Sequence, residues 1–316
     1  MTFKYTLHYN PSYVTLGGST KNYLWHSNRK SRPICRTYFD KCIVRPKVNY
    51  CYQVLKDELK GDKAEASQQI DLYNNDAAKM MAGRTIQTLA DDYLINKKAD
   101  TIEDAIGAGA ELFNEYKPRT WDDGKDERQH ELNRDSFSSV LKNALEGIQE
   151  AQVQLGLNTL TGETEIMASV PGLALPFNGR PDYSGCIELK TTWASVANTK
   201  SGKRSASLPT QPSWSHLCQV SGYWFYTKRP QALVYSNETT YRIFTAENCE
   251  RLTEEGLAAT FNWVAAKCRI REHQLKSAES VNDLIKNIEP DFGHMWAWDI
   301  HPEVLKEAKQ LWGFIR

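Results

Sequence analysis

The stretch that decides the fold spans residues 178–193 and reads NGRPDYSGCIELKTTW. It contains Asp182, then a short turn, then Glu188 and Lys190 two positions apart. If residues 186–191 form a strand, the alternation of side chains places Glu188 and Lys190 on one face of it. A hairpin whose first strand ends at Asp182 would bring a second carboxylate to that face.

Two carboxylates beside one ammonium group predict a cation site. Asp182 and Glu188 would repel each other unless a hard cation lay between them. Mg²⁺ and Mn²⁺ prefer oxygen ligands of this kind. The stretch therefore predicts a metal site with Lys190 next to it.

The order of the motifs resembles the PD-(D/E)xK nuclease superfamily. Pro181-Asp182 and Glu188-x-Lys190 match its signature, and Gln219-Val-Ser-Gly-Tyr223 matches the Q-x-x-x-Y motif of its exonuclease branch. Within that branch, the order of motifs is similar to the mitochondrial genome maintenance exonuclease and its phage-encoded relatives. The resemblance covers residues 82–246.

The resemblance implies an α/β fold with a restriction-endonuclease-like core, in which helices flank a mixed central sheet. It also implies a metal-dependent DNA exonuclease. Asp182, Glu188 and the main-chain carbonyl of Leu189 would hold one or two Mg²⁺ or Mn²⁺ ions. An acidic residue on an earlier strand completes the ligand set in the family. Glu165 is the expected residue here, and Glu163 is the alternative.

The remaining catalytic roles also follow from the resemblance. Lys190 would orient or help to deprotonate the attacking water and would offset developing charge. Gln219 and Tyr223 lie four positions apart, so a helix presents them on one face, where they would fix the substrate. His216 and Tyr226 fall on nearby turns, where they could assist the site, although we expect them to pack or to face solvent.

Other residues are expected to contact substrate. Related nucleases carry Gly-x-x-x-His on a helix, whereas this chain has Gln87 four positions after Gly83. Glutamine is a poor direct metal ligand, so we expect Gln87 to act through water or to be structural, with Arg84 near the substrate. A long connection over residues 192–213 is either a DNA-contacting flap or a disordered insertion. Its basic residues are Lys200, Lys203 and Arg204.

The first fifty residues are strongly basic and aromatic. They contain nine Lys or Arg against the single acid Asp40, together with nine aromatic residues. Basic groups for phosphates, interleaved with rings for bases, suit single-stranded DNA. The alternative is a small β layer whose aromatic side chains form a core.

Three regions are predicted: a basic aromatic segment at 1–53, a helical region at 54–157 that lends a helix to the core, and the nuclease core with C-terminal helices at 158–316. Helices are expected at 76–96, 99–116, 135–156, 214–226 and 246–276, with two short ones after 281. Strands are expected at 165–170, 173–182, 186–191, 232–235 and 241–244.

Within the helical region, Asp135 is expected to cap the third helix. His130 and Glu131 are then expected to be solvated in a polar loop.

Bulk composition limits the other classes of function. The seven cysteines include no C-x-x-C pair, which favours a reducing compartment over a disulfide framework. Only Cys249 and Cys268 follow the core, which argues against the iron–sulfur cluster of some relatives. No apolar run is long enough to span a membrane, so we expect a cytoplasmic protein, in the host cytoplasm if it is phage-encoded.

Several alternatives stay open. The enzyme could be a duplex-end recombination exonuclease or an endonuclease for flapped or branched DNA. A protein of another class, a catalytically silent DNA-binding module, would also fit the fold. Besides DNA, replication or recombination proteins are candidate partners.

Overall fold

The structure is a computed structural model that describes residues 77–118, 124–173, 177–196, 203–204 and 206–277. The predicted segment 1–53 and the two short helices after 281 lie outside this part of the chain. The described α-helices are α4 (Ala78–Leu94), α5 (Ile102–Asn114), α6 (Lys125–Gln154), α7 (Trp214–Thr227) and α8 (Glu254–Ser277), and a 3-10 helix, η2 (Glu250–Leu252), precedes α8. The described strands are β1 (Ile166–Ala168), β2 (Phe177–Gly179), β3 (Ile187–Thr191), β4 (Ser195–Val196), β5 (Lys203–Arg204), β6 (Ala232–Ser236) and β7 (Tyr241–Phe244).

The fold is mixed α/β and divides into two compact units. One unit comprises Asp76–Ile166 and Gly179–Asn262, which hold the sheet and all the candidate site residues described below. The other takes in the 167–178 segment and the second half of α8. In the part of the chain that is described, no helix combines the length and apolarity needed to cross a membrane.

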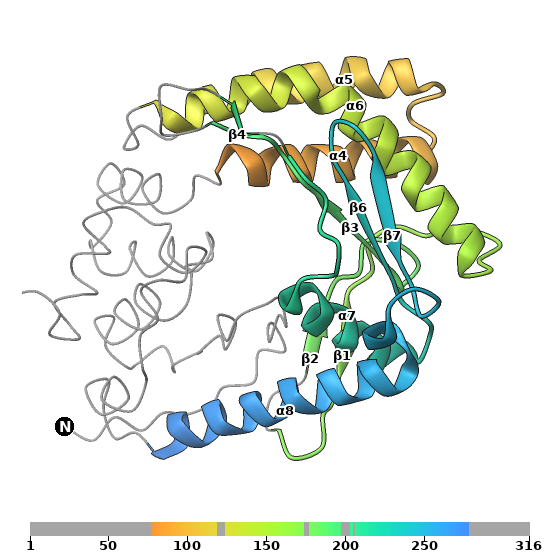
Figure 1. The fold of residues 1–316 in the computed structure, drawn as a ribbon, viewed down its shortest axis with the longest axis vertical. Helices are drawn as coiled ribbons and strands as arrows, with labels where there is room; N and C mark the ends of the chain where they lie inside the picture. The colour runs from red at the N-terminus through yellow and green to blue at the C-terminus, as the bar shows by residue number, and fades with distance from the viewer. Residues whose placement is uncertain (1–76, 119–123, 174–176, 197–202, 205, 278–316) are drawn as a thin grey trace, which may run out of the picture. The chain divides into compact units, whose positions relative to one another are not determined.

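A three-stranded sheet with the order β3-β6-β7 lies at the centre of the first unit (Figure 1). β3 runs parallel to β6, with Lys190 opposite Tyr235, and β7 is antiparallel to β6. All five residues of β6 are buried, as expected for a central strand covered on both faces.

Alternation along β3 divides its side chains between two layers. Ile187 and Leu189 join the main hydrophobic core, which α4 and α6 supply from one face of the sheet. Glu188 and Lys190 point to the opposite face, where α7 lies. The sheet therefore separates the main hydrophobic core from the layer that contains Glu188 and Lys190.

The predicted pairing of the second strand with β3 is wrong, because β2 pairs with β1 in a separate two-stranded sheet. β2 ends at Gly179, before Asp182, and a single antiparallel bridge joins Tyr183 to Ile187. Between them the backbone turns through Ser184 and Gly185, which both have positive φ, at 51° and 73°. Such a pair reverses the chain tightly, so Asp182 still reaches β3.

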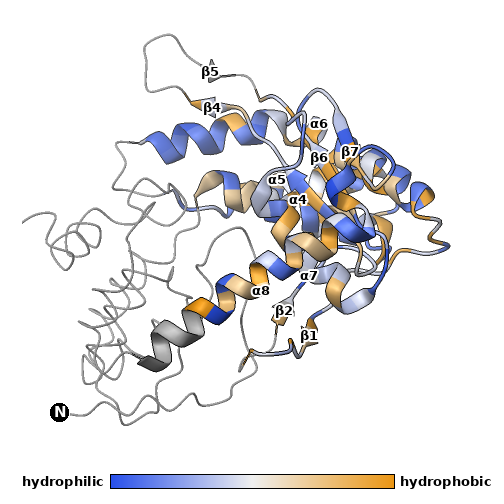
Figure 2. Ribbon diagram, turned by 60° about the horizontal axis from the view of Figure 1, so that its bottom comes forward, coloured by the Kyte–Doolittle hydropathy of each residue, from blue (hydrophilic) through white to orange (hydrophobic). Residues whose placement is uncertain are grey.

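The start of the third helix was predicted wrongly, whereas its end lies within two residues of the prediction. α6 begins at Lys125 rather than after Asp135. Figure 2 shows that this early part of the helix is largely hydrophilic, which is why the sequence suggested a loop. Its polar residues are buried because they have partners: Asp126 accepts a hydrogen bond of 2.8 Å from the first amide of α4. Gln129 likewise donates to the carbonyl of Ala194 at 2.8 Å.

His130 is also buried, contrary to expectation. It lies on α6 rather than in a solvated loop, and its ring stacks on Phe113 with centroids 5.6 Å apart. The ring of Tyr116 also packs against His130, with centroids 4.8 Å apart. These contacts give His130 a structural role.

Candidate active site

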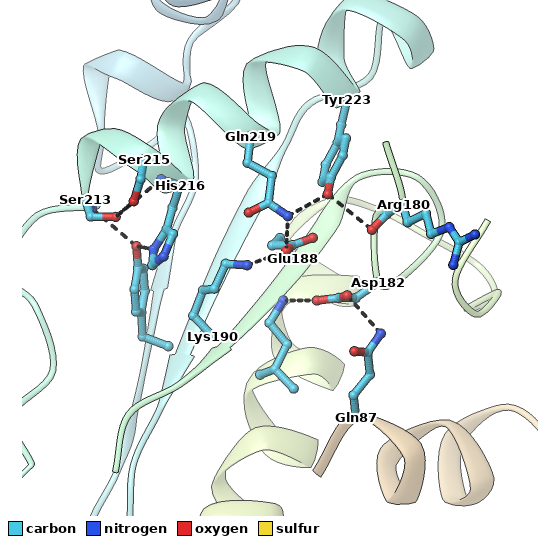
Figure 3. Close-up of polar contacts among 12 residues, drawn as sticks. Gln87, Arg180, Asp182, Glu188, Lys190, Ser213, Ser215, His216, Gln219 and Tyr223 are labelled. Atoms are coloured by element: carbon cyan, nitrogen blue, oxygen red, sulfur yellow. Dashed lines mark hydrogen bonds and ion pairs between the residues drawn. The ribbon is translucent and has the colours of Figure 1, made fainter. Parts of the chain in front are cut away.

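Asp182 is held by two hydrogen bonds from different directions (Figure 3). The side-chain amide of Gln87, on α4, donates to Oδ1 at 2.9 Å. The backbone N–H of Leu189, on β3, donates to Oδ2 at 2.8 Å. Because each carboxylate oxygen has its own donor, the plane of the carboxylate is fixed.

Glu188 is the most deeply buried acid of the site, with 3% of its side chain exposed. Both Lys190 Nζ and Gln219 Nε2 donate to its Oε1, each at 2.5 Å. Its other oxygen, Oε2, is buried and has no hydrogen-bond partner among the described residues. Protein donors therefore satisfy Oε1 of Glu188, whereas Oε2 remains available to a ligand.

The helix α7 adds a second layer over the carboxylates. Gln219 also donates to the hydroxyl of Tyr223 at 2.6 Å. That hydroxyl donates in turn to the main-chain carbonyl of Arg180, at 3.2 Å. The Ser213 hydroxyl caps the helix by accepting from the N–H of His216. The hydrogen bonds of Gln219 and Tyr223 thus link α7 to the segment that carries Asp182.

The electrostatics show two acids forced together. Burial, and then the nearby charge of Glu188, raises the pKa of Asp182 well above its usual range. Burial alone would lower the pKa of Lys190, but Glu188 and Asp182 outweigh that effect and leave it raised. Lys190 is therefore a protonated ammonium at neutral pH, and Asp182 lacks a full counter-charge.

A divalent cation would suit this arrangement. Asp182 and Glu188 offer hard oxygen donors, and the unpartnered Oε2 of Glu188 is the kind of buried atom that a cation satisfies. In the described part of the chain, no three His, Cys, Asp or Glu side chains gather closely enough to form a ligand set. Asp182 and Glu188 are the residues that would hold such a cation, and no third described acid lies close enough to join them.

The two candidates for that third acid lie against Arg180. Its guanidinium is 3.6 Å from Glu163 and 3.9 Å from Glu165. Glu165 lies immediately before β1 rather than on the strand where it was expected. Glu163 still acts on the site, because its charge contributes to the raised pKa of Asp182.

His216 and Tyr235 form a polar pair beside Lys190 that the sequence analysis did not predict. His216 Nδ1 is 2.7 Å from the hydroxyl of Tyr235, the residue opposite Lys190 in the sheet. Burial, followed by the charge of Lys190, lowers the pKa of His216 to about 3. The imidazole is therefore neutral and packed, whereas Tyr226 is exposed as expected.

Asp91, one helical turn after Gln87, was also missed. Burial raises its pKa to about 6, and the neighbouring hydroxyl of Tyr183 opposes that shift. Tyr183 is fully buried and lies among the charges of Asp91, Asp182 and Glu188. A further titratable group, Asp91 of α4, therefore lies near the charges of the candidate site.

The other predicted substrate-binding residues come from two parts of the chain, α4 and the connection after β3. Arg84 is exposed on α4, three positions before Gln87. Lys200 lies outside the described residues. Lys203 and Arg204 form β5, which pairs with β4 in a small separate ribbon. The long connection therefore contains at least one short hairpin.

Comparison with known proteins gives little guidance. No family model matches the chain, and no curated protein matches it. Among solved structures, the chain is similar to one titled "Crystal structure of SSO0001", with 16% sequence identity over 60% of this chain and 91% of that chain. The TM-score of 0.24 is too low for that likeness to support any argument.

Proposed function

We propose that this protein is a Mg²⁺- or Mn²⁺-dependent deoxyribonuclease of the PD-(D/E)xK type, built on a restriction-endonuclease-like core, that degrades DNA from single-stranded ends. One observation carries the proposal. Asp182, Glu188 and Lys190 come together with Gln219 and Tyr223, although a loop, a strand and a helix supply them.

The residues have distinct roles in this proposal. Asp182 and Glu188 hold the cation, with the Leu189 carbonyl as a further ligand. The cation, when bound, supplies Lewis-acid polarisation of the phosphodiester and makes a nearby water more acidic. Lys190 orients that water and offsets the charge that develops on the phosphate. Gln219 and Tyr223 keep Glu188 and the Arg180 backbone in position.

A single-stranded substrate is favoured by the N-terminal sequence. The excess of basic and aromatic residues in 1–53 suits a flexible strand whose bases can stack on rings. Lys200, Lys203 and Arg204 in the connection after β3 would add phosphate contacts. Duplex ends and flaps are the competing substrates.

The test is cleavage of 5′- and 3′-labelled single-stranded DNA in Mg²⁺, Mn²⁺ or EDTA. Wild type is compared with Lys190→Ala and with Lys142→Ala, a control that removes an exposed lysine from α6. We expect metal-dependent degradation by wild type and Lys142→Ala, and a loss of about 10²-fold or more in Lys190→Ala. The order in which the two labels are released gives the polarity.

Two further comparisons make the result decisive. Circular single strands, blunt duplexes and flapped duplexes separate an exonuclease for single-stranded ends from the competing enzymes. Circular dichroism and the melting temperature show whether Lys190→Ala is folded. DNA binding without cleavage by folded wild type, in every metal, would replace the nuclease with a catalytically silent binding module.

A further inference from the structure

Arg180 contacts two parts of the candidate site at once. Its main-chain carbonyl accepts the Tyr223 hydroxyl, and its guanidinium reaches Glu163 and Glu165. Figure 3 shows the guanidinium directed away from Glu188. The backbone of this arginine is therefore fixed at the site, while its charge faces outward.

The ion pairs of Arg180 are weak. They are 3.6 Å and 3.9 Å long, and half of the arginine side chain is exposed. Exposed pairs of this kind contribute only about 0–1 kcal/mol to stability. A phosphate can accept two parallel hydrogen bonds from one guanidinium, which makes it a stronger partner than either carboxylate here.

Because of where Arg180 lies, exchanging its two carboxylate partners for a phosphate would affect the cation site. It lies two residues before Asp182, with the rigid Pro181 between them and its carbonyl bonded to Tyr223, so a phosphate on its guanidinium would be held by the segment that carries Asp182. Glu163 and Glu165 would then lose the positive charge that Arg180 supplies to them. Among the described residues no third acid lies close enough to Asp182 and Glu188 to join them, and Glu163 and Glu165 are the acids that precede Asp182 most closely in sequence.

We propose that Arg180 is a phosphate-binding residue that couples DNA binding to completion of the cation site. Its guanidinium passes from Glu163 and Glu165 to a backbone phosphate, and a released carboxylate turns to the cation held by Asp182 and Glu188. This inference rests on the proposed nuclease function. It makes the affinity for metal and the affinity for DNA mutually dependent.

The test measures Mn²⁺ affinity of the full chain by electron paramagnetic resonance, without DNA and with a nuclease-resistant single-stranded oligonucleotide. In wild type we expect DNA to tighten Mn²⁺ binding by about fivefold or more. In Arg180→Gln, Mn²⁺ should bind more tightly without DNA, DNA should bind more weakly, and DNA should no longer change the Mn²⁺ affinity.

Removing a positive charge could by itself tighten Mn²⁺ binding, so a second variant is needed. Arg180→Gln combined with Glu163→Gln and Glu165→Gln should lose the gain. Arg229→Gln, which removes an exposed arginine bonded to the Ser184 carbonyl, should leave the coupling intact. Equal Mn²⁺ affinities in the single and triple Arg180 variants would overturn the exchange.

Failure of this inference is distinguishable from failure of the proposed function. Asp182→Asn should abolish specific Mn²⁺ binding whenever the nuclease site is real. If it does so while Arg180→Gln behaves as wild type, only the exchange is wrong. If Asp182→Asn leaves Mn²⁺ binding unchanged, both proposals are wrong.

Discussion

The side chain of Gln87 donates a hydrogen bond of 2.9 Å to Asp182 across 95 positions of sequence, joining α4 to the turn before β3. Since the Leu189 amide occupies the other oxygen of Asp182, the carboxylate is held in one orientation. A histidine at position 87 could bind a cation directly. Gln87 instead holds, by its hydrogen bond, the Asp182 carboxylate that would bind the cation.

Substitutions of Gln87 should separate these two roles. Gln87→Ala leaves one buried oxygen of Asp182 unpaired, so we expect a loss of about 1–3 kcal/mol in the free energy of unfolding. Gln87→Glu places a third acid beside Asp182, which should lower stability without metal and enlarge the rise in melting temperature caused by Mg²⁺. Thr88→Ala, on the exposed side of α4, is the control. A Mg²⁺ response in Gln87→Glu no larger than in Gln87→Ala would count against a cation at Asp182.

Replacing Asp182 should have opposite effects with and without metal. The burial of Asp182 next to Glu188 raises its pKa, so the ionised form costs stability in the folded state. Asp182→Asn keeps the shape and removes that charge, and we expect it to melt no lower than wild type in EDTA. A cation at a hundred times its dissociation constant adds about 2.7 kcal/mol to the folded state. Scanning calorimetry should detect this rise in wild type only, and equal shifts in both proteins would exclude the site.

Two glycines provide a matched test of the packing of α6 on the sheet. A Cβ on Gly147 would lie 2.7 Å from Val234 of β6 and 3.2 Å from Tyr241 of β7. We expect Gly147→Ala to destabilise the fold by about 1–3 kcal/mol, which outweighs the gain in helix propensity. On α5, Gly107 has no atom within 4 Å of the same position, so Gly107→Ala should stabilise by up to about 1 kcal/mol. Urea unfolding measures the change in stability of both variants. Changes of the same sign in the two variants would contradict this packing.

The sequence predicted the elements whose pattern is local. α4, α7 and β7 lie at or within two residues of the predicted ranges, because each has its own apolar period or turn. The start of α6 was missed because its polar face is buried by partners such as Ala194, which are distant in sequence. The partner of β3 was missed for the same reason. Its main neighbour is β6, which no local spacing identifies.

The site was predictable where alternation or helical spacing brings residues together. Glu188 and Lys190 share a face of β3, and Gln219 and Tyr223 share a face of α7. His216 lies three positions before Gln219, a spacing that could have placed it on the same face. The ion pairs of Arg180 depend on how the 163–165 segment approaches it, which no pattern in the sequence encodes.

The titration of His216 gives the last prediction. Its pKa is lowered from 6.5 to about 3 by burial and then by Lys190, so the folded protein keeps the imidazole neutral. Between these values the unfolded chain takes up a proton that the folded chain does not, and the free energy of unfolding falls as the pH falls. His216→Gln removes this contribution. We therefore expect wild type to lose stability relative to the variant below about pH 6.5, by at most about 1.4 kcal/mol per pH unit.

Asp91 acts in the opposite direction over part of the same range. Its pKa is raised to about 6, so it lowers the free energy of unfolding as the pH rises from about 4 to 6. Because wild type and His216→Gln both contain Asp91, its effect cancels in their difference. Urea unfolding of both proteins from about pH 4 to 7 measures that difference. A constant difference over the whole range would mean that His216 titrates normally and is not held neutral beside Lys190.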